Sequence, residues 1–228
     1  MATHQEIAGV TDEELVNRMI SSHGDRFDDM FWNYFSETID PHLSPVPTMI
    51  DIGCGPGLLL RDLRSRYANA ILHGYDVTAA MIEYADNEVD YEGDEPGFHI
   101  HDITDEEIPL GDGCVDLVSM VAVLHVLPEP IPVLQKVARV LKPGGVFLLQ
   151  DWIRTPLPAY LDRMTGDAPP ERAEAVRSAM YRLFPAHNKY TTEDWLWVLE
   201  QAGFSVINHQ QLRSPHFCAF VCKVNNID

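Results

Sequence analysis

The chain of 228 residues is long enough to bury the core of one large domain. It carries a formal net charge of −19, from 16 lysines and arginines against 35 aspartates and glutamates. This acidic excess argues against a nucleic acid partner and against an anionic membrane surface, because both require basic side chains.

The lack of a recognisable secretory signal and the spacing of the cysteines predict a cytoplasmic protein. The first residues show no basic and apolar secretory signal, and no uncharged apolar run is long enough to span a membrane. Cys218 and Cys222 are expected four residues apart on one strand, about 13 Å along its axis, which is too far for a disulfide. No cysteine–histidine metal spacing occurs, so we expect reduced thiols and no bound metal.

Two helical segments are predicted before the first strand. Thr11 and Glu14 have the spacing of a capping box, and an apolar face follows them. The second segment, Asp25–Ile39, is rich in aromatic residues and is followed by prolines that end it. Aromatic residues at helical spacing are more often core than ligand contacts.

A glycine-rich loop lies in the stretch Met49–Leu60, which reads MIDIGCGPGLLL. Its apolar residues predict a buried strand before the loop and a helix after it, with Asp51 near the end of the strand. Gly53, Gly55 and Gly57 permit positive φ angles and a close approach of a ligand to the main chain. The N–H groups at the start of the helix would face that ligand, as in nucleotide-type sites at the carboxyl end of a parallel strand.

The spacing of these glycines excludes two common loops. The dinucleotide fingerprint G-x-G-x-x-G needs a small third residue where this chain has Leu58, and no lysine follows as in a phosphate-binding loop. The segment resembles motif I of the class I S-adenosylmethionine (SAM)-dependent methyltransferases, [VIL]-[LIV]-D-x-G-C-G-x-G. Six consecutive matching positions disfavour the alternative, a strand–turn–helix without a ligand.

Acidic residues at the ends of the next two strands are candidate cofactor ligands. A strand is predicted over Ala70–Tyr75, and Asp76 follows Gly57 by 19 residues, near the spacing of about 20 at which a carboxylate meets the ribose. Asp76 could instead cap the next helix. The run D-x-[ST]-x-x-M resembles the family pattern and favours the ribose, with Met81 along the adenine. Asp102, after the strand Phe98–His101, would by the same resemblance accept the adenine amino group, or else form a turn.

The resemblance implies a larger set of cofactor contacts. A helix before motif I often covers the cofactor in this family, so Trp32 and Tyr34 are included at even odds. The full predicted set is Trp32, Tyr34, Asp51, Gly53, Cys54, Gly55, Gly57, Asp76, Val77, Met81, Asp102, Ile103 and Val121.

The chain from residue 117 to residue 150 continues the family pattern. Leu117–Leu127 resembles the motif DLVxSxxVLHHL after strand four, and the N-P-P-Y signature of amino-group methylases is absent. His125 is expected on the helix after that strand, as a structural residue or a candidate base. A helix over Ile131–Leu141 and the turn LKPGG lead to strand five, Val146–Gln150.

Strand–helix alternation to this point predicts a doubly wound α/β fold, with a mostly parallel seven-stranded sheet of the Rossmann-like methyltransferase type. We expect one domain over residues 1–228: an N-terminal helical lid (1–47), a cofactor-binding core (48–150), a substrate cap inserted after strand five (151–190), and a C-terminal helix with two strands (191–228). In the cap, Pro169-Pro170 is expected to open a helix that Phe184-Pro185 ends. Thr191 and Asp194 predict a second capping box, and Phe204–His209 and His216–Val224 predict an antiparallel pair.

The family resemblance implies SAM-dependent methyl transfer to a small-molecule acceptor. The protein must then align the acceptor and remove its proton. Asp151, at the end of strand five, is the first candidate for that work, although capping of the insertion explains it equally well. His125 is the second catalytic candidate, and Arg154, Tyr160, His187 and Tyr190 are candidate substrate contacts.

Three other functions remain open. The same pocket could serve an enzyme that cyclises or cleaves SAM, or a SAM-binding protein without catalysis. A dinucleotide oxidoreductase is disfavoured by Leu58. The sequence leaves the acceptor and the oligomeric state undetermined. We also expect Asp25–Ile39 and Asp151–Tyr190 to close over the acceptor, rather than to form a fixed helical layer.

Overall fold

The computed structural model describes residues 4–166, 173–212 and 215–225. Within these residues, seven strands form one sheet in the order β3-β2-β1-β4-β5-β7-β6. Strands β1 to β5 pair in parallel, and β7 pairs antiparallel with both β5 and β6. This confirms the predicted Rossmann-like fold. The strands are β1 (Thr48–Ile52), β2 (Ile71–Asp76), β3 (Gly97–Ile100), β4 (Val115–Val121), β5 (Leu141–Trp152), β6 (Phe204–Gln211) and β7 (Phe217–Val224).

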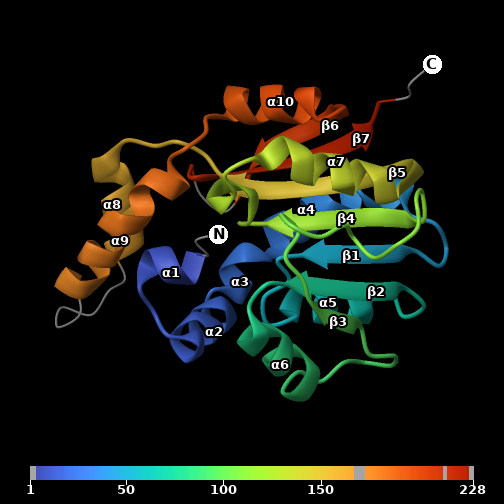
Figure 1. The fold of residues 1–228 in the computed structure, drawn as a ribbon, viewed down its shortest axis with the longest axis horizontal. Helices are drawn as coiled ribbons and strands as arrows, with labels where there is room; N and C mark the ends of the chain where they lie inside the picture. Colours follow the sequence, from blue (N-terminus) through green and yellow to red (C-terminus); the bar gives the residue numbers. More distant parts are fainter. Residues whose placement is uncertain (1–3, 167–172, 213–214, 226–228) are drawn as a thin grey trace.

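Helices cover both faces of the sheet (Figure 1). Alternate residues of β1 point to opposite faces, so Met49 and Ile50 enter different hydrophobic clusters. The cluster of Met49 includes residues of α4 (Asp29–Thr38), α5 (Leu58–Arg66) and α6 (Ala79–Asn87). The cluster of Ile50 includes residues of α7 (Pro130–Val140) and α10 (Thr192–Gln201).

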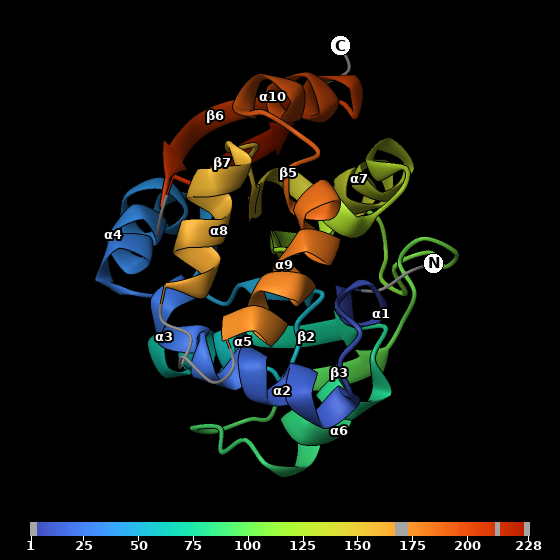
Figure 2. The same cartoon turned by 90° about the vertical axis from the view of Figure 1, so that its left-hand side faces the viewer.

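A third group of helices stands beyond the carboxyl ends of the parallel strands (Figures 1 and 2). It comprises α1 (His4–Ala8), α2 (Asp12–Ser21), α3 (His23–Arg26), α8 (Leu157–Thr165) and α9 (Ala173–His187). Helix α9 packs against α8 and α1, and α2 packs against α6. None of the described helices has the length and hydropathy needed to cross a membrane.

Both predicted capping boxes form. The Thr11 hydroxyl accepts from the Glu14 N–H at 3.2 Å, and the Glu14 carboxylate accepts from the Thr11 N–H at 2.9 Å. Thr191 and Asp194 make the same reciprocal pair, at 3.1 and 2.7 Å. These bonds satisfy N–H groups that the first helical turn leaves without partners, and so they fix where α2 and α10 begin.

Three local predictions need correction. Strand β5 begins at Leu141 instead of Val146, because Leu141 pairs with Val115 before the ladder shifts register. His125 lies in a short 3-10 helix, Leu124–Val126. Helix α9 runs past Pro185 to His187, since the missing N–H does not prevent the Asn188 N–H from donating to the Phe184 carbonyl at 2.9 Å. The predicted helix start at Pro169-Pro170 lies outside the described residues.

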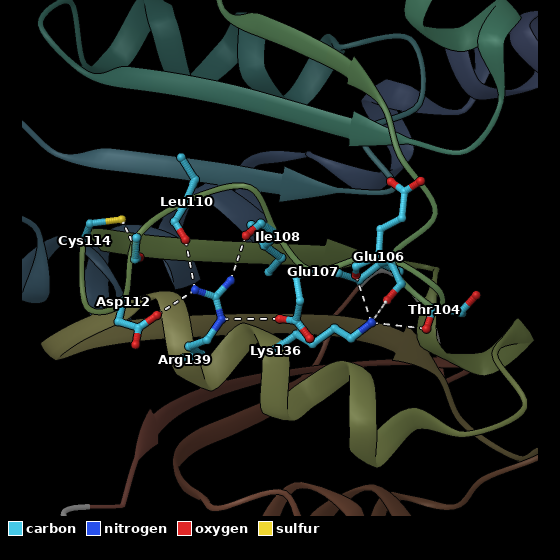
Figure 3. Close-up of polar contacts among 11 residues, drawn as sticks. Thr104, Glu106, Glu107, Ile108, Leu110, Asp112, Cys114, Lys136 and Arg139 are labelled. Atoms are coloured by element: carbon cyan, nitrogen blue, oxygen red, sulfur yellow. Dashed lines mark hydrogen bonds and ion pairs between the residues drawn. The ribbon is translucent and has the colours of Figure 1, made fainter.

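The connection between β3 and β4 is held by two basic side chains of α7 (Figure 3). The Lys136 ammonium donates to the carbonyls of Ile103, Thr104 and Glu106, at 2.9 to 3.1 Å. Arg139 donates to carbonyls of the same connection at Ile108 and Leu110, and to the Asp112 carboxylate. Because its carbonyls are satisfied in this way, the segment needs no helix of its own to stay against the sheet.

Candidate functional site

A pocket of about 450 Å³ lies at the carboxyl ends of the parallel strands, under the third group of helices. Its lining comes from the loops after β1, β2, β3 and β4, from α2 and α3, and from α8, α9 and the adjoining ends of β5 and β7. Of the predicted cofactor contacts, ten line it: Asp51, Gly53, Cys54, Gly55, Asp76, Val77, Met81, Asp102, Ile103 and Val121.

Glycine is required where the loop after β1 turns. Gly53 has a φ of +71°, and a Cβ at that position would lie 2.2 Å from Cγ2 of Val123. The N–H groups of Gly53 and Cys54 both donate to the Tyr75 carbonyl, at 2.7 and 3.1 Å. The loop is therefore tied to the end of β2, and its backbone faces the pocket without an intervening side chain.

Asp51 is a buried carboxyl group in the pocket wall. Burial raises its pKa to about 7, although a hydrogen bond from the Ser119 hydroxyl (2.6 Å) acts in the opposite direction. The nearby Asp76 also raises this pKa, and Arg26 lowers it. A cationic group placed beside Asp51 would favour its ionised form.

Asp76 is the last residue of β2, and Asp102 lies just after β3. The Asp76 carboxylate accepts from the N–H groups of Gly55 (2.9 Å) and Thr78 (2.8 Å), and burial raises its pKa. Asp102 is partly exposed. Burial also acts to raise its pKa, but the hydrogen bonds from the Thr104 hydroxyl (2.6 Å) and N–H (2.9 Å) outweigh burial and hold it below the usual range. Both carboxylates are therefore fixed in orientation at the pocket.

The N-terminal part of the lining lies earlier in the chain than predicted. It runs from Leu15 to Phe27, through α2 and α3, whereas Asp25–Ile39 was expected. Arg26 holds this segment together by donating to the Met19 carbonyl (3.1 Å) and the Ser22 hydroxyl (2.7 Å). The sequence predicted an apolar face for α2, but it did not indicate that the polar residues beside this face would line a pocket.

Trp32, Tyr34 and Gly57 do not line the pocket. Trp32 and Tyr34 belong to the hydrophobic cluster between α4 and the sheet, and the Arg66 guanidinium lies 3.8 Å from the centre of the Trp32 ring. Gly57 is the N-cap of α5 at a φ of +74°, and a Cβ there would lie 2.5 Å from the Tyr91 hydroxyl. The identity of all three residues is therefore explained by packing within the fold.

The cap side of the pocket is lined mainly by apolar side chains. Those contributed by α8, α9 and the adjoining ends of β5 and β7 are Trp152, Met164, Val176, Met180, Leu183, His187 and Phe217. The His187 ring stacks on Trp152 with 3.8 Å between ring centroids and 7° between planes. Its Nδ1 lies 2.7 Å from the Tyr160 hydroxyl. His187 is thus held in one orientation, and it is the predicted substrate residue that reaches the pocket.

The two predicted catalytic residues form a buried pair behind the lining. Asp151 Oδ1 lies 2.7 Å from Nδ1 of His125, and both side chains are almost completely buried. The Asp151 carboxylate also accepts from the N–H groups of Trp152 (2.7 Å) and His125 (3.2 Å). Neither residue is part of the pocket lining. The pair therefore positions Trp152, which does line the pocket.

The remaining predicted substrate contacts have structural surroundings. Arg154 donates to the carbonyls of Asn188 and Lys189, at 3.1 and 3.0 Å. Tyr160 is a buried residue of α8 that contacts Phe184 and His187 of α9, and burial raises its pKa above the ordinary range. The Tyr190 ring packs on Trp195, with 4.4 Å between ring centroids. Tyr160 acts on the pocket through His187, whereas Arg154 and Tyr190 hold the base of the cap.

Most of the apolar cap lining was missed from the sequence. Val176, Met180 and Leu183 lie in a helix that was predicted without a role in the pocket for these three side chains. The sequence also did not indicate that Ala122, just after β4, would line the pocket. It adopts a φ of +58°, which is strained for a residue with a Cβ, and such residues cluster at functional sites.

Residues 50–149 match the family model described as a methyltransferase domain. This range holds the strand ends and loops of the polar side of the pocket. It excludes α1 to α4 and the cap helices α8 and α9.

Individual relatives share this central part of the chain at modest identity. A 27-O-demethylrifamycin SV methyltransferase of Amycolatopsis mediterranei (strain S699) is 33% identical over 116 residues, covering 50% of this chain and 42% of the relative. A tRNA N(3)-cytidine methyltransferase of Gallus gallus is 29% identical over 112 residues, covering 46% and 30%. The chain thus spans less than half the length of these relatives.

A solved structure matches over nearly the whole chain. The plantazolicin methyltransferase BpumL, in complex with S-adenosylhomocysteine (SAH), superposes with a TM-score of 0.71 at 16% identity, covering 99% of this chain and 95% of the other. At this identity the match establishes the fold, with both the N-terminal helices and the cap inside the aligned range.

Proposed function

We propose that this chain, whose residues 50–149 match the methyltransferase-domain family model, is a SAM-dependent methyltransferase acting on a small-molecule acceptor. The observation that carries the proposal is one pocket with two unlike sides. The ends of β1, β2 and β3 bring three carboxyl groups to it, and the cap brings an apolar chamber with one imidazole.

The polar side of the pocket fits SAM. Asp51, a buried carboxyl group whose pKa is near 7, suits a cationic amino acid end. Asp76, fixed by the Gly55 and Thr78 N–H groups, is the carboxylate proposed to meet the ribose, and Met81, Ile103 and Asp102 are the residues proposed to meet the adenine. When bound, SAM supplies a methyl group on a positively charged sulfur. The glycine loop lets the backbone approach this ligand, and the helices from α2 to α3 exclude water from it.

The cap supports a small acceptor. Met180 and Leu183 are only 5% and 1% exposed, so this part of the chamber wall is shielded from solvent. His187 is fixed by Trp152 and Tyr160 and borders this chamber as an oriented imidazole. The Asp151–His125 pair supports this arrangement from behind.

Cofactor binding is the first test. Calorimetry should show that SAM and SAH bind to the full chain and that nicotinamide dinucleotides do not. Asp76→Ala should weaken SAH binding by about 1–3 kcal/mol, because it leaves polar partners unsatisfied. Asp90→Ala removes an exposed carboxylate outside the pocket and should leave binding unchanged. Equal affinities in the two variants would remove Asp76 from the site.

The reaction type is tested by the products. Incubation with SAM alone should release no methylthioadenosine, whereas a cyclase or lyase would form it without an acceptor. A metabolite extract should then yield SAH together with one methylated product. SAM binding without turnover in any extract would favour a non-catalytic binding protein.

A nucleic acid acceptor is disfavoured by the charge of the chain, although several relatives are tRNA N(3)-cytidine methyltransferases. With 35 acidic against 16 basic residues, long-range repulsion opposes phosphate backbones. We expect no retention on immobilised tRNA or duplex DNA at about 0.15 M salt, which is near physiological ionic strength. Retention that weakens steeply with salt would overturn this part of the proposal.

A further inference from the structure

The cap side of the pocket has its own chemistry, distinct from that of the cofactor side. We define the cap chamber as the part lined by Trp152, Met164, Met180, Leu183, His187 and Phe217. The described residues that α8, α9, β5 and β7 contribute to the pocket include no acidic side chain, no lysine and no arginine. His187 is the titratable group among them.

The chamber would penalise a charged acceptor. Moving an isolated charge from water into apolar surroundings costs several kcal/mol unless an opposite charge compensates it. The four chamber residues Trp152, Met180, Leu183 and Phe217 are each at most 7% exposed, so water is largely excluded there. The net charge of −19 adds long-range repulsion against an anion.

The same chamber would favour a flat apolar molecule. Trp152 and Phe217 contact each other with 4.3 Å between ring centroids and form an aromatic wall. Met164 and Met180 add flexible, polarisable side chains that adapt to irregular shapes. The imidazole of His187 stacks on Trp152 and is hydrogen-bonded to the Tyr160 hydroxyl, so it extends this wall as a third flat ring, and a ligand lying on the wall is buried among aromatic and apolar atoms.

We propose that the acceptor is an uncharged, largely apolar molecule with one hydroxyl group, bound against the aromatic wall of the chamber. This inference rests on the proposed function. It names the substrate class of the same pocket: a neutral aromatic or aliphatic alcohol or phenol, in contrast to sugars, phosphates and carboxylates.

Two probes that differ by one charge test the proposal. 2-Naphthol is neutral at pH 7, and 6-hydroxynaphthalene-2-sulfonate has the same rings and hydroxyl with a permanent negative charge. Binding to the full chain saturated with SAH is measured by calorimetry. We expect 2-naphthol to bind and the sulfonate to bind at least tenfold more weakly. Equal binding of the two, tighter binding of the sulfonate, or no binding of 2-naphthol would overturn the proposal.

A charge introduced into the chamber sharpens the test. Met164→Lys places a cation in the chamber at a partly buried position, and Met30→Lys does the same at a residue that is 50% exposed and outside the pocket. Met164→Lys should weaken 2-naphthol binding at least fivefold and reduce the preference over the sulfonate, while Met30→Lys should change neither. Parallel effects in the two variants would contradict the proposed location.

SAH affinity, measured in every variant, separates this inference from the proposed function. A chain that fails to bind SAH fails as a SAM-dependent enzyme. A chain that binds SAH normally, but shows no preference for the neutral probe, loses only the assigned acceptor class.

Discussion

The two sides of the pocket are built in different ways. On the polar side, hydrogen bonds between the turns after β1 and β2 hold Gly53 and Asp76, and the Ser119 hydroxyl of β4 holds Asp51. On the cap side, side chains from segments as distant as Trp152 and Phe217 meet through packing. Short, repeated strand–loop units therefore specify the first side, and long-range burial specifies the second. The matched family range includes the first side and stops before the cap.

The largest effect is expected where the cap depends on a buried polar pair. Asp151→Ala leaves the His125 ring and two backbone N–H groups without their carboxylate acceptor. Breaking such a pair typically costs about 3–5 kcal/mol. We expect a loss of this size in the free energy of unfolding, measured with urea.

The chain offers a matched control for this variant. Asp112 also pairs at 2.7 Å, with Arg139, but its side chain is 80% exposed (Figure 3). Asp112→Ala should cost less than about 1 kcal/mol, as exposed ion pairs do. Similar losses in the two variants would mean that the cap side is not supported by the buried pair.

A large effect is also expected where the polar side depends on backbone shape. Gly53→Ala would place a methyl group 2.2 Å from Val123 and would require a residue with a Cβ to adopt a φ of +71°. The conformation costs about 1–2 kcal/mol and the overpacking about 1–3 kcal/mol. We expect SAH affinity to fall at least tenfold. Gly93→Ala, at a φ of +98° with open space around it, carries only the conformational cost and should leave affinity unchanged.

An effect of intermediate size is expected from the ionisation of Asp51. Its pKa is raised by burial from 3.8 to about 7, so the folded chain keeps a proton that the unfolded chain releases. The contribution of Asp51 to the free energy of unfolding should therefore fall as pH rises from about 4 to about 7. A bound cation favours the ionised carboxylate, so SAM affinity should rise as pH increases from 6 to 8.

Each pKa unit by which the bound cation lowers the Asp51 pKa corresponds to about 1.4 kcal/mol, or up to tenfold in affinity. Calorimetry at pH 6, 7 and 8 measures this slope. Asp51→Asn removes the titrating group and should flatten it. A slope that persists in this variant would assign the pH dependence to another residue.

The smallest effect on ligand binding is expected at Trp32, which lies on neither side of the pocket. Trp32→Leu removes an aromatic ring from the cluster under α4 and the cation–π contact with Arg66. Large-to-small substitutions of this kind reduce stability by about 1–5 kcal/mol. SAH affinity should stay within about twofold of the unchanged chain. A tenfold loss would return Trp32 to the cofactor site.

The polar side could be predicted from the sequence because its geometry is local. A strand followed by a glycine loop places Asp51, Gly53 and Gly55 at the strand end whatever packs above them. The spacing from Gly57 to Asp76 likewise follows from one helix and one strand. Gly57 shows where this local prediction fails. It belongs to the same motif, but a Cβ there would clash with the Tyr91 hydroxyl, so the glycine is needed for packing and does not line the pocket.

The cap side could not be predicted because its members are chosen by tertiary contacts. The sequence placed Asp151 at a strand end and suggested a role in the reaction, yet its carboxylate turns to His125 behind the pocket. The sequence also ended a helix at Pro185, and the actual helix continues far enough to place His187 against Trp152. In α2 and α9, an apolar face gives no information on whether it meets the core or a ligand.

The base of the cap is closed by hydrogen bonds, and this makes the cap a separable unit for protein engineering. The Arg154 N–H donates to the Tyr190 carbonyl at 2.7 Å, so the point where the chain leaves β5 lies beside the point where it enters α10. A segment whose two ends meet can be exchanged for another of different length without moving the strands on either side. Grafting a segment of different sequence between residues 154 and 190 would therefore test whether this segment selects the proposed acceptor while SAH binding stays unchanged.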